Sequence, residues 1–433
     1  MPDVMQVFSK NSGNAENYRI PALIVTKHGT MVACADERFF TAGDNPNRID
    51  KVVRRSADNG ATWGEQIVMV KEVGESKPKS SAAIDPALLY DEETDTIFCL
   101  YCHTPAGIGI LNSTLGLGDT KFGKRIMRGS KNYYMQADGS LLDSKKQATG
   151  YTVDGDGFVM EAGAKLCNIY AGDGEFKEFR TSYLMITASH DDGLTWSQPF
   201  CLDKMTKSPY MGFIGPGPGV GIQIKNGKYK GRLVFPIYFN VIKFPLMMSN
   251  AVIYSDDHGA TWQRGKCPND GREIGLGIKM SHRFVLPRHM VSESQVIELA
   301  DGSLKIFMRN HHPKHLIATA TSSDGGASWA NFSFHPQLVH SVCQCSVINV
   351  MHNDKPATLF INAADSKKRI NGTIRLSYDY GATFPHSKLI KEGEFVYSSM
   401  VQMPNGEIGV LFEGSTKHET VDFMSFPIDF ILE

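Results

Sequence analysis

Short apolar, β-prone runs separated by turn-forming residues recur along the whole chain. Where two such runs flank a short polar turn, the pattern predicts a β-hairpin. Six hairpins are predicted in this way, at residues 20–38, 85–103, 217–239, 295–309, 345–363 and 398–414. Their turns contain Gly, Asn or Asp, which tolerate the backbone conformations that tight turns require. The chain is therefore predicted to be all-β.

An octapeptide, Ser-x-Asp-x-Gly-x-(Thr/Ser)-Trp, interleaves with these hairpins. It occupies residues 56–63, 189–196, 255–262 and 322–329, and a fifth copy at 377–384 ends in Phe instead of Trp. The Asp side chain is expected to accept backbone N–H groups two residues further on, and the Gly to adopt a positive φ. Each copy therefore predicts a hairpin turn late in a repeated β unit.

Hairpin, strand, octapeptide and strand together make one four-stranded blade, and six such units predict a six-bladed β-propeller. The sixth unit has no octapeptide. Its last strand is predicted from residues 3–8 or from residues 423–430, and either choice would join the chain ends and remove an exposed sheet edge. Residues 1–433 are therefore expected to form a single propeller domain.

One segment, residues 105–181, does not fit this repeat. It lies between the second and third strands of blade two and carries turn signals at Asp138-Gly139 and Asp154-Gly155. Its aromatic and β-branched residues favour an inserted β-rich subdomain over a disordered loop.

The charge balance excludes two classes of partner. The chain has 45 Lys and Arg against 46 Asp and Glu, which gives no electrostatic footprint for nucleic acid or for an anionic membrane surface. No apolar run is long enough to predict a membrane span, and the first residues lack the features of a signal peptide. The chain is therefore expected to be cytoplasmic if it is complete, or a trimmed catalytic domain of a secreted protein.

The eight cysteines are dispersed and are expected to be free, mostly buried thiols. Cys99 and Cys102 have the spacing of a redox motif, and Cys343 and Cys345 could approach each other. Both pairs lie in strand-like runs, without a second Cys or His pair at zinc spacing. The histidines of residues 311–315 are expected to lie in an exposed loop. The sequence therefore predicts neither a metal nor a cofactor.

Polar and charged residues gather at the starts and ends of the hairpins. In every blade the start of the first strand and the end of the second strand lie at one face, and the octapeptide turns lie at the other. The residues predicted to project to the first face are Arg19, Asp36, Arg38, Asp44, Asp85, Glu293, Arg309, Arg369, Tyr397 and Glu413. A shared site around the central channel is therefore expected at this face.

At these residues the chain resembles a known family, the microbial exo-sialidases (neuraminidases), and it is similar to the group that contains sialidases and intramolecular trans-sialidases. The resemblance covers essentially the whole chain. The motifs that carry it are Tyr18-Arg-Ile-Pro-Ala-Leu23, Ala35-Asp-Glu-Arg38, Phe307-Met-Arg309, Gly393-Glu-Phe-Val-Tyr397, Ile408-Gly-Val-Leu-Phe-Glu413 and the octapeptides, which correspond to the Asp boxes of that family.

The resemblance implies roles for particular residues. The carboxylate-binding arginine triad of the family falls on Arg19, Arg309 and Arg369. The nucleophile falls on Tyr397, and the glutamate that activates it falls on Glu293.

The remaining roles follow from the same resemblance. The acid/base aspartate lies in the loop after the first hairpin, at Asp44. Glu413 is expected to support Arg19, and Arg38 to lie beside the arginine triad. Asp85 corresponds to the position that reads the amide or hydroxyl edge of the sugar.

The chemistry of sialic acid explains why these residue types are needed. The sugar carries a carboxylate on its anomeric carbon, which a guanidinium binds through two parallel hydrogen bonds. A carboxylate nucleophile would place like charges together, whereas a tyrosine is neutral until attack, and sialidases are the exception that uses one. Retention of configuration through a sialyl–tyrosine intermediate is expected, with sialylated glycans as substrates.

Three functions stay open at this point. The first is an exo-α-sialidase that hydrolyses terminal sialic acid, and the second is an intramolecular trans-sialidase that releases an anhydro-sialic acid. The third is a sialic-acid-binding propeller without catalysis. The second would need an aromatic platform over the leaving group, and since every Trp lies in an Asp box, the candidates are Tyr133, Tyr134, Phe239 and Phe244.

Overall fold

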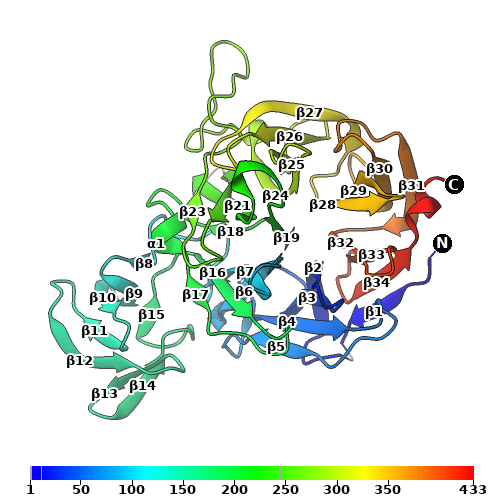
Figure 1. The fold of residues 1–433 in the computed structure, drawn as a ribbon. Helices are drawn as coiled ribbons and strands as arrows, with labels where there is room; N and C mark the ends of the chain where they lie inside the picture. The colour runs from blue at the N-terminus through cyan, green and yellow to red at the C-terminus, as the bar shows by residue number, and fades with distance from the viewer. Residues whose placement is uncertain (1, 11, 243–245) are drawn as a thin grey trace.

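The computed structural model describes residues 2–10, 12–242 and 246–433, and strands dominate it. Its sheets are arranged around a central axis in a propeller-like fold, with the first strand of each unit toward the axis (Figure 1). These inner strands contact one another around that axis. The prediction of an all-β propeller is confirmed at this level.

Three sheets of the described residues have four antiparallel strands each; two follow sequential order, and the third takes its outer strand from the N-terminus. The first contains β24 (Val291–Glu298), β25 (Leu304–Asn310), β26 (Leu316–Ser322) and β27 (Ala330–Val339); the second contains β28 (Cys345–His352), β29 (Lys355–Ala363), β30 (Ile370–Ser377) and β31 (His386–Glu394); the third contains β32 (Ser398–Gln402), β33 (Ile408–Phe412), β34 (Val421–Phe426) and β1 (Met5–Phe8).

Both candidates for the last strand of the final unit are used. Strand β34 pairs with β33, and β1 then pairs with the free edge of β34. The two ends of the chain therefore lie side by side, as Figure 1 shows, and close the ring with main-chain hydrogen bonds.

The first two units are joined in one nine-stranded sheet among the described residues. It contains β2 (Asn17–Val25), β3 (Met31–Arg38), β4 (Ile49–Ser56), β5 (Ile67–Val70), β6 (Ala82–Asp91), β7 (Thr96–Thr104), β16 (Tyr183–Ser189), β17 (Phe200–Cys201) and β19 (Gly219–Val220). A single parallel pair, Ile49 with Ala82, joins β4 to β6. Because the two units share a sheet, the count of six blades stays a prediction.

The predicted hairpin at 217–239 was wrong in its first half. Its sheet contains β18 (Ile214–Pro216), β20 (Ile222–Gln223), β21 (Leu233–Ile242), β22 (Met247–Ser255) and β23 (Gln263–Arg264). Strands β18 and β20 both pair with β21. Between them the chain turns away from β21, and β19 pairs in parallel with β6 instead. Pro218 lacks an N–H group and Gly219 has a φ of +121°, so this segment cannot continue a regular ladder.

The octapeptides form turns, but with a different hydrogen-bond pattern from the one predicted. In the first copy the Ser56 hydroxyl accepts the N–H of Gly60, which has a φ of +80°. The Asp58 carboxylate accepts the N–H and the hydroxyl of Thr62, four residues further on rather than two. The Ser-to-Gly and Asp-to-Thr/Ser contacts recur in the other four copies.

Helix is scarce. It comprises α1 (Asp203–Thr206) and the 3₁₀ turns η1 (Lys77–Lys79), η2 (Gly227–Tyr229), η3 (Pro287–His289) and η4 (Ile428–Ile431). Within the described ranges, no helix has the length and hydropathy that crossing a membrane requires.

Between β7 and β16 the chain forms a separate eight-stranded antiparallel sheet, which lies at the side of the propeller (Figure 1). Its strands are β8 (Asp119–Thr120), β9 (Gly123–Arg128), β10 (Lys131–Met135), β11 (Ser140–Leu142), β12 (Ala148–Val153), β13 (Phe158–Glu161), β14 (Ala164–Asn168) and β15 (Phe176–Glu178). Ile126, Leu141, Val159 and Phe176 give it a hydrophobic core of its own. The subdomain limits at 105 and 181 stay a prediction.

A buried ion cluster fastens this sheet to the propeller. His103 on β7 lies 2.8 Å from Glu72 through Nδ1 and 2.8 Å from Glu178 on β15 through Nε2. Lys124 on β9 lies 2.6 Å from the second oxygen of Glu178. Burial lowers the pKa of His103, but the two carboxylates outweigh it and raise that pKa to about 10. The two cations balance the two anions, so the buried charges are compensated.

This cluster predicts how stability depends on pH. The unfolded His103 loses its proton near pH 6.5 and the folded one near pH 10, so its contribution is fully present below pH 6.5 and is lost as the pH rises to 10. The free energy of unfolding should therefore fall by up to ~1.4 kcal/mol per pH unit in that window. Urea unfolding across the window should show this decline. His103→Gln should remove it between pH 8 and 10, above the range in which the raised pKa of Asp85 also lowers stability as the pH rises. His190→Gln, at an exposed histidine, should keep it.

Candidate active site

Seven of the ten residues predicted to share a face line one cavity of about 290 Å³. They are Arg19, Asp44, Asp85, Glu293, Arg309, Arg369 and Tyr397. The cavity lies where the first strands begin and the second strands end. The octapeptide turns follow the third strands and therefore lie at the opposite face. The other three residues, Asp36, Arg38 and Glu413, are fully buried behind the cavity.

Tyr397, directly before β32, forms a closed triangle with two residues of another sheet. Its hydroxyl donates to Oε1 of Glu293 at 2.5 Å, and Arg309 donates through Nη1 to Oε2 of Glu293 at 2.6 Å and to the tyrosine oxygen at 2.8 Å. Burial and the charge of Glu293 raise the pKa of Tyr397 far above its usual value, although Arg309 and Arg369 act to lower it. The phenol is therefore neutral and holds its proton toward Glu293.

Two further guanidinium groups flank the same ring. The Cζ atoms of Arg19 and Arg369 lie 5.6 and 5.7 Å from the ring centroid of Tyr397. Among the ion pairs of the described residues, Arg19 and Arg309 have acidic partners and Arg369 has none. Three cations thus surround one phenol, and at least one of them is free to bind an anion.

Glu413, after β33, holds Arg19 from behind. Its Oε2 lies 3.3 Å from Nη2 of Arg19, and its Oε1 accepts the backbone N–H of Ile20 at 2.8 Å. Nδ1 of His418 lies 3.0 Å from the same Oε2. Burial acts to raise the pKa of Glu413, but Arg19 and His418 outweigh it and lower that pKa to about 2. The carboxylate is therefore permanently charged.

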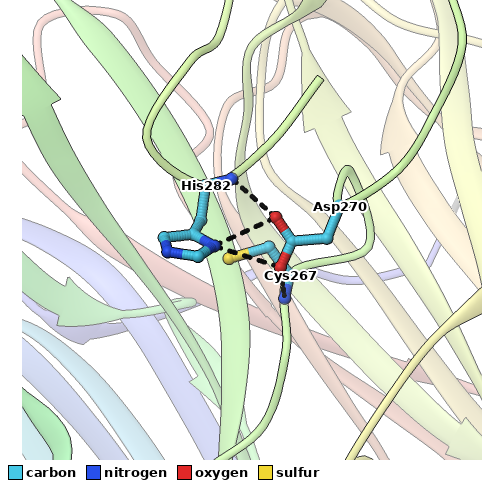
Figure 2. A group of neighbouring side chains, drawn as sticks. All are labelled: Cys267, Asp270 and His282. Carbon is cyan, nitrogen blue, oxygen red and sulfur yellow. Dashed lines mark hydrogen bonds and ion pairs between the residues drawn. The ribbon is translucent and has the colours of Figure 1, made fainter. Parts of the chain in front are cut away.

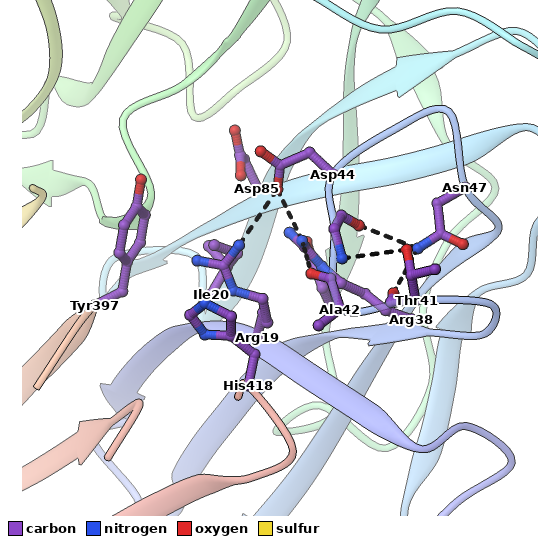
Figure 3. A network of polar contacts seen from close by, with 12 residues as sticks. Arg19, Ile20, Arg38, Thr41, Ala42, Asp44, Asn47, Asp85, Tyr397 and His418 are labelled. Atoms are coloured by element: carbon purple, nitrogen blue, oxygen red, sulfur yellow. Dashed lines mark hydrogen bonds and ion pairs between the residues drawn. The ribbon is translucent and has the colours of Figure 1, made fainter. Parts of the chain in front are cut away.

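Asp44 projects from the loop after β3 toward Arg19, as Figure 3 shows. Its Oδ1 accepts from Arg38 at 2.8 Å and from Arg19 at 3.4 Å. The side chain of Asp44 is 65% exposed, whereas that of Arg38 is fully buried. Desolvation acts to raise the pKa of Asp44, but the charges of Arg38 and Arg19 lower it to about 2.

Asp36 and Lys51 form a buried ion pair that contacts Arg38. Asp36 accepts a hydrogen bond from Arg38 at 2.8 Å, and its other oxygen contacts the ammonium group of Lys51. Lys51 also donates to the carbonyl of Ala83 at 2.8 Å. All three charged side chains are fully buried, so each depends on its neighbours for compensation.

Asp85 lies at the floor of the cavity in a different electrostatic state. Its Oδ2 accepts from the hydroxyl of Tyr238 at 2.9 Å. Burial raises the pKa of Asp85 to about 8, and the negative charges of Asp36, Glu293 and Asp44 add to the effect. At neutral pH this group is therefore mostly a neutral carboxylic acid, which can donate a hydrogen bond as well as accept one.

The backbone is strained at two positions of the cavity wall. Ile20 and Asp85 have φ values of +58° and +62°, and each precedes a proline. Both lie at irregularities of the strand register, in β2 and β6. A β-branched residue at positive φ is rare and costs about 1–3 kcal/mol, and such strain concentrates at functional sites. The bulges turn these two residues out of the strand pattern and toward the cavity.

One wall of the cavity is apolar, and the sequence did not identify it. It consists of Ile84, Ile110, Phe213, Tyr238, Leu246 and Met248. Of the aromatic residues considered for a platform, Phe239 is fully buried, because alternation along β21 turns its neighbour Tyr238 to the cavity instead. Tyr133 and Tyr134 lie on β10 of the inserted sheet and do not line the cavity, and Phe244 lies outside the described residues.

Residues 157–410, more than half of the chain, match the family described as BNR repeat-like domain. The chain belongs to this family. Its curated relatives include an anhydrosialidase of Macrobdella decora, 27% identical over 94% of this chain and 59% of that protein. A sialidase of Micromonospora viridifaciens is 28% identical over 92% of this chain and 50% of that protein. The sialidase resemblance is thus confirmed, and the chain spans 50–59% of the length of these two relatives.

Solved structures of intramolecular trans-sialidases agree with the fold. The intramolecular trans-sialidase of Ruminococcus gnavus, solved with oseltamivir carboxylate, aligns with a TM-score of 0.82 and 25% identity over 99% of this chain and 98% of that one. The leech intramolecular trans-sialidase, solved with 2,7-anhydro-Neu5Ac, aligns with a TM-score of 0.85 and 24% identity over 100% and 71% of the two chains.

The charge pair at Asp44 allows a direct test of the site. Arg38→Gln should raise the pKa of Asp44 from about 2, because the charge of Arg38 contributes more than any other cation to lowering that pKa. Carbon-13 NMR titration of the labelled aspartate carboxylates would measure the change. Arg48→Gln, which removes an arginine paired with Asp50 instead, is the matched control. An Asp44 titration that is unchanged in Arg38→Gln would contradict the pairing.

Proposed function

We propose that this chain is an exo-α-sialidase, a glycoside hydrolase that removes terminal sialic acid from glycans with retention of configuration. The observation that carries the proposal is the neutral Tyr397 phenol, bonded to Glu293 and surrounded by three guanidinium groups. The sialidase relatives support it. We further propose that the nine-stranded sheet consists of two blades joined by one pair, which gives six blades with the inserted subdomain in the second.

The sugar carboxylate would bind to the arginine triad. Arg369 has no acidic partner among the described residues, and Arg19 and Arg309 line the same cavity beside the phenol. Charge-assisted hydrogen bonds of this kind contribute about 1.5–3 kcal/mol each. The negative charge of the sugar thus replaces solvent around cations that Glu413 and Glu293 only partly compensate.

Attack would begin with the phenol in its protonated state. As the Tyr397 oxygen forms a bond to the anomeric carbon, its proton passes to Glu293 along the existing hydrogen bond, and the electron pair of the glycosidic bond leaves with the aglycon oxygen. Arg309 stays within 2.8 Å of the phenol oxygen and stabilises the charge that develops there. Water then attacks the anomeric carbon and gives a proton to the ionised Asp44, while the bond to the tyrosine oxygen breaks and Glu293 returns its proton to the phenol.

Asp44 would protonate the leaving oxygen, but its pKa near 2 in the free protein leaves it ionised. Binding of the substrate carboxylate would shift Asp44 toward its protonated state. It neutralises part of the charge of Arg19 and excludes water from the exposed side of Asp44, and both effects raise the pKa of that carboxyl. Asp44 would therefore become a competent general acid only when a carboxylated sugar is bound. This adds substrate selectivity to general acid/base catalysis, which accelerates a reaction by about 10²–10⁴-fold.

A second candidate is an intramolecular trans-sialidase. It is favoured by the apolar wall, which can exclude water from the intermediate and leave a hydroxyl of the sugar itself as the acceptor. The alignment with the Ruminococcus gnavus enzyme over nearly its full length also supports it. A binding protein without catalysis is disfavoured by the intact Tyr397, Glu293 and Asp44.

Product analysis distinguishes these functions. The protein is incubated with 3′-sialyllactose, and the products are followed by proton NMR. Free sialic acid, appearing first as the α-anomer, is the expected outcome. A 2,7-anhydro sugar would instead establish the intramolecular transfer, and unchanged substrate at high protein concentration would refute both enzymatic functions.

The nucleophile is tested by Tyr397→Phe. Turnover of 4-methylumbelliferyl sialic acid should fall by about 10³-fold or more, since the side chain then cannot form the intermediate. Binding of sialic acid, measured by calorimetry, should persist because the arginine triad is intact. Tyr380→Phe, in an octapeptide turn at the opposite face, is the matched control and should keep full turnover. Full turnover in Tyr397→Phe would remove this residue from the mechanism.

A further inference from the structure

A long loop follows β23 and brings together three side chains that the proposed sialidase chemistry does not use. Cys267 and Asp270 lie at its start, and His282 lies near its end. One sulfur, one oxygen and one nitrogen atom of these residues lie within 4.8 Å of one another. Figure 2 shows the imidazole, the carboxylate and the thiol facing a common point at the base of the loop.

The carboxylate of this cluster is held in place by the backbone. Asp270 accepts the N–H of His282 at 2.6 Å and the N–H of Cys267 at 3.2 Å. Nδ1 of His282 lies 3.1 and 3.2 Å from its two oxygens. Separations of this size are those between ligand atoms that share one small cation, which Zn²⁺ binds at about 2.0–2.3 Å.

The thiol is the least explained group of the cluster. Cys267 is 5% exposed, and its sulfur makes no hydrogen bond within residues 2–10, 12–242 and 246–433. Cys267 packs in a hydrophobic cluster, and the buried Cys345 likewise has no hydrogen bond from its sulfur among the described residues. By contrast, the thiols of Cys99 and Cys102 contact backbone carbonyls at 3.9 and 3.8 Å. The Cys267 sulfur instead points toward His282 and Asp270 (Figure 2).

We propose that Cys267, Asp270 and His282 bind a zinc ion. Thiolate, imidazole and carboxylate are the ligand types that zinc prefers, and water would complete a tetrahedral site. Binding requires the ionised thiol and the neutral imidazole, so the thiol proton passes to solvent as the sulfur–zinc bond forms. The two charges of the ion then match the thiolate and the carboxylate, and the site is neutral overall.

The position of the ion gives it a structural role. Zinc would close the loop between Cys267 and His282, whose tip carries the fully exposed Leu276. Beyond His282 the chain continues to Val285 and Met290, which pack with Phe213, Tyr238 and Met248 in one hydrophobic cluster. These last three residues line the candidate active site, so the ion would fix the outer support of the apolar wall.

The sequence predicted no metal, because neither Cys pair has a second pair of Cys or His at the spacing of a zinc site. Here each residue type occurs once, and residues 271–281 separate His282 from Asp270. Only the folded loop brings the three together. The proposal does not depend on sialidase activity.

Cobalt and zinc binding test the proposal. The protein is stripped with chelator and titrated with Co²⁺, and the thiolate-to-cobalt charge-transfer absorption is recorded. One equivalent per chain is expected to bind the metal-free protein with release of protons to a weak buffer, and zinc should then displace the cobalt. Cys267→Ser should abolish the absorption and weaken zinc binding by at least ~10-fold. Saturating zinc should raise the midpoint of thermal unfolding of the native protein, and less so that of Cys267→Ser.

A matched variant distinguishes this site from other thiols. Cys201→Ser changes a half-buried cysteine outside the three-residue cluster and should keep both the absorption and the stoichiometry. His282→Ala should behave like Cys267→Ser, and circular dichroism would verify that both variants remain folded. Failure of the native protein to bind one equivalent, or binding that is unchanged in Cys267→Ser, would overturn the proposal.

Discussion

Mutual repulsion among three guanidinium groups is the constraint around which the candidate site is built. Cations gathered beside one phenol stay together only if anions compensate them in the absence of ligand. Glu293 compensates Arg309, and Arg369 has no acidic partner among the described residues. Arg19 is compensated within an alternating series of contacts, which runs through Lys51, Asp36, Arg38, Asp44, Arg19, Glu413 and His418. The series links the first unit to the loop after β33. The ion pairs that hold Arg19 therefore join the first and last units of the ring.

The same compensation determines how the site can react. Asp44 is an element of the series, and the cations that hold it also keep it ionised, which is the wrong state for a general acid. Asp85 lines the same cavity, but it has no ion-pair partner among the described residues and is largely protonated at neutral pH. Two carboxyl groups of one cavity thus differ in charge because of their surroundings alone. A bound carboxylate is the change that would bring Asp44 toward the protonated state.

Local patterns predicted the repeated elements well, because each hairpin and octapeptide turn is specified within a few residues of chain. The prediction for 345–363 agrees with β28 and β29 to the residue. The prediction for 217–239 was wrong where the chain leaves its own sheet, at Pro218 and Gly219. The sequence could place Arg19 and Tyr397 at one face, but it could not reveal Lys51 or His418. Lys51 lies 15 residues from Asp36, and His418 pairs with the nearby Glu413. Both pairs are close in sequence, but they matter because they are largely buried and because Glu413 also holds Arg19, 394 residues away. Neither the burial nor that long-range contact has a local signal.

The charged residues and the apolar residues that line this cavity come from different parts of the fold. The charged half comes from hairpin ends of several sheets, and the alternating contacts fix it tightly. The apolar half comes mainly from the second and third units, and Val285 and Met290, which flank η3, pack against it. The charged half can select a carboxylated sugar and activate the phenol, but it does not distinguish water from a hydroxyl of the same sugar as acceptor. That choice depends on how closely the apolar half covers the intermediate. Residues 265–290 can therefore influence the product while lying outside the reacting groups.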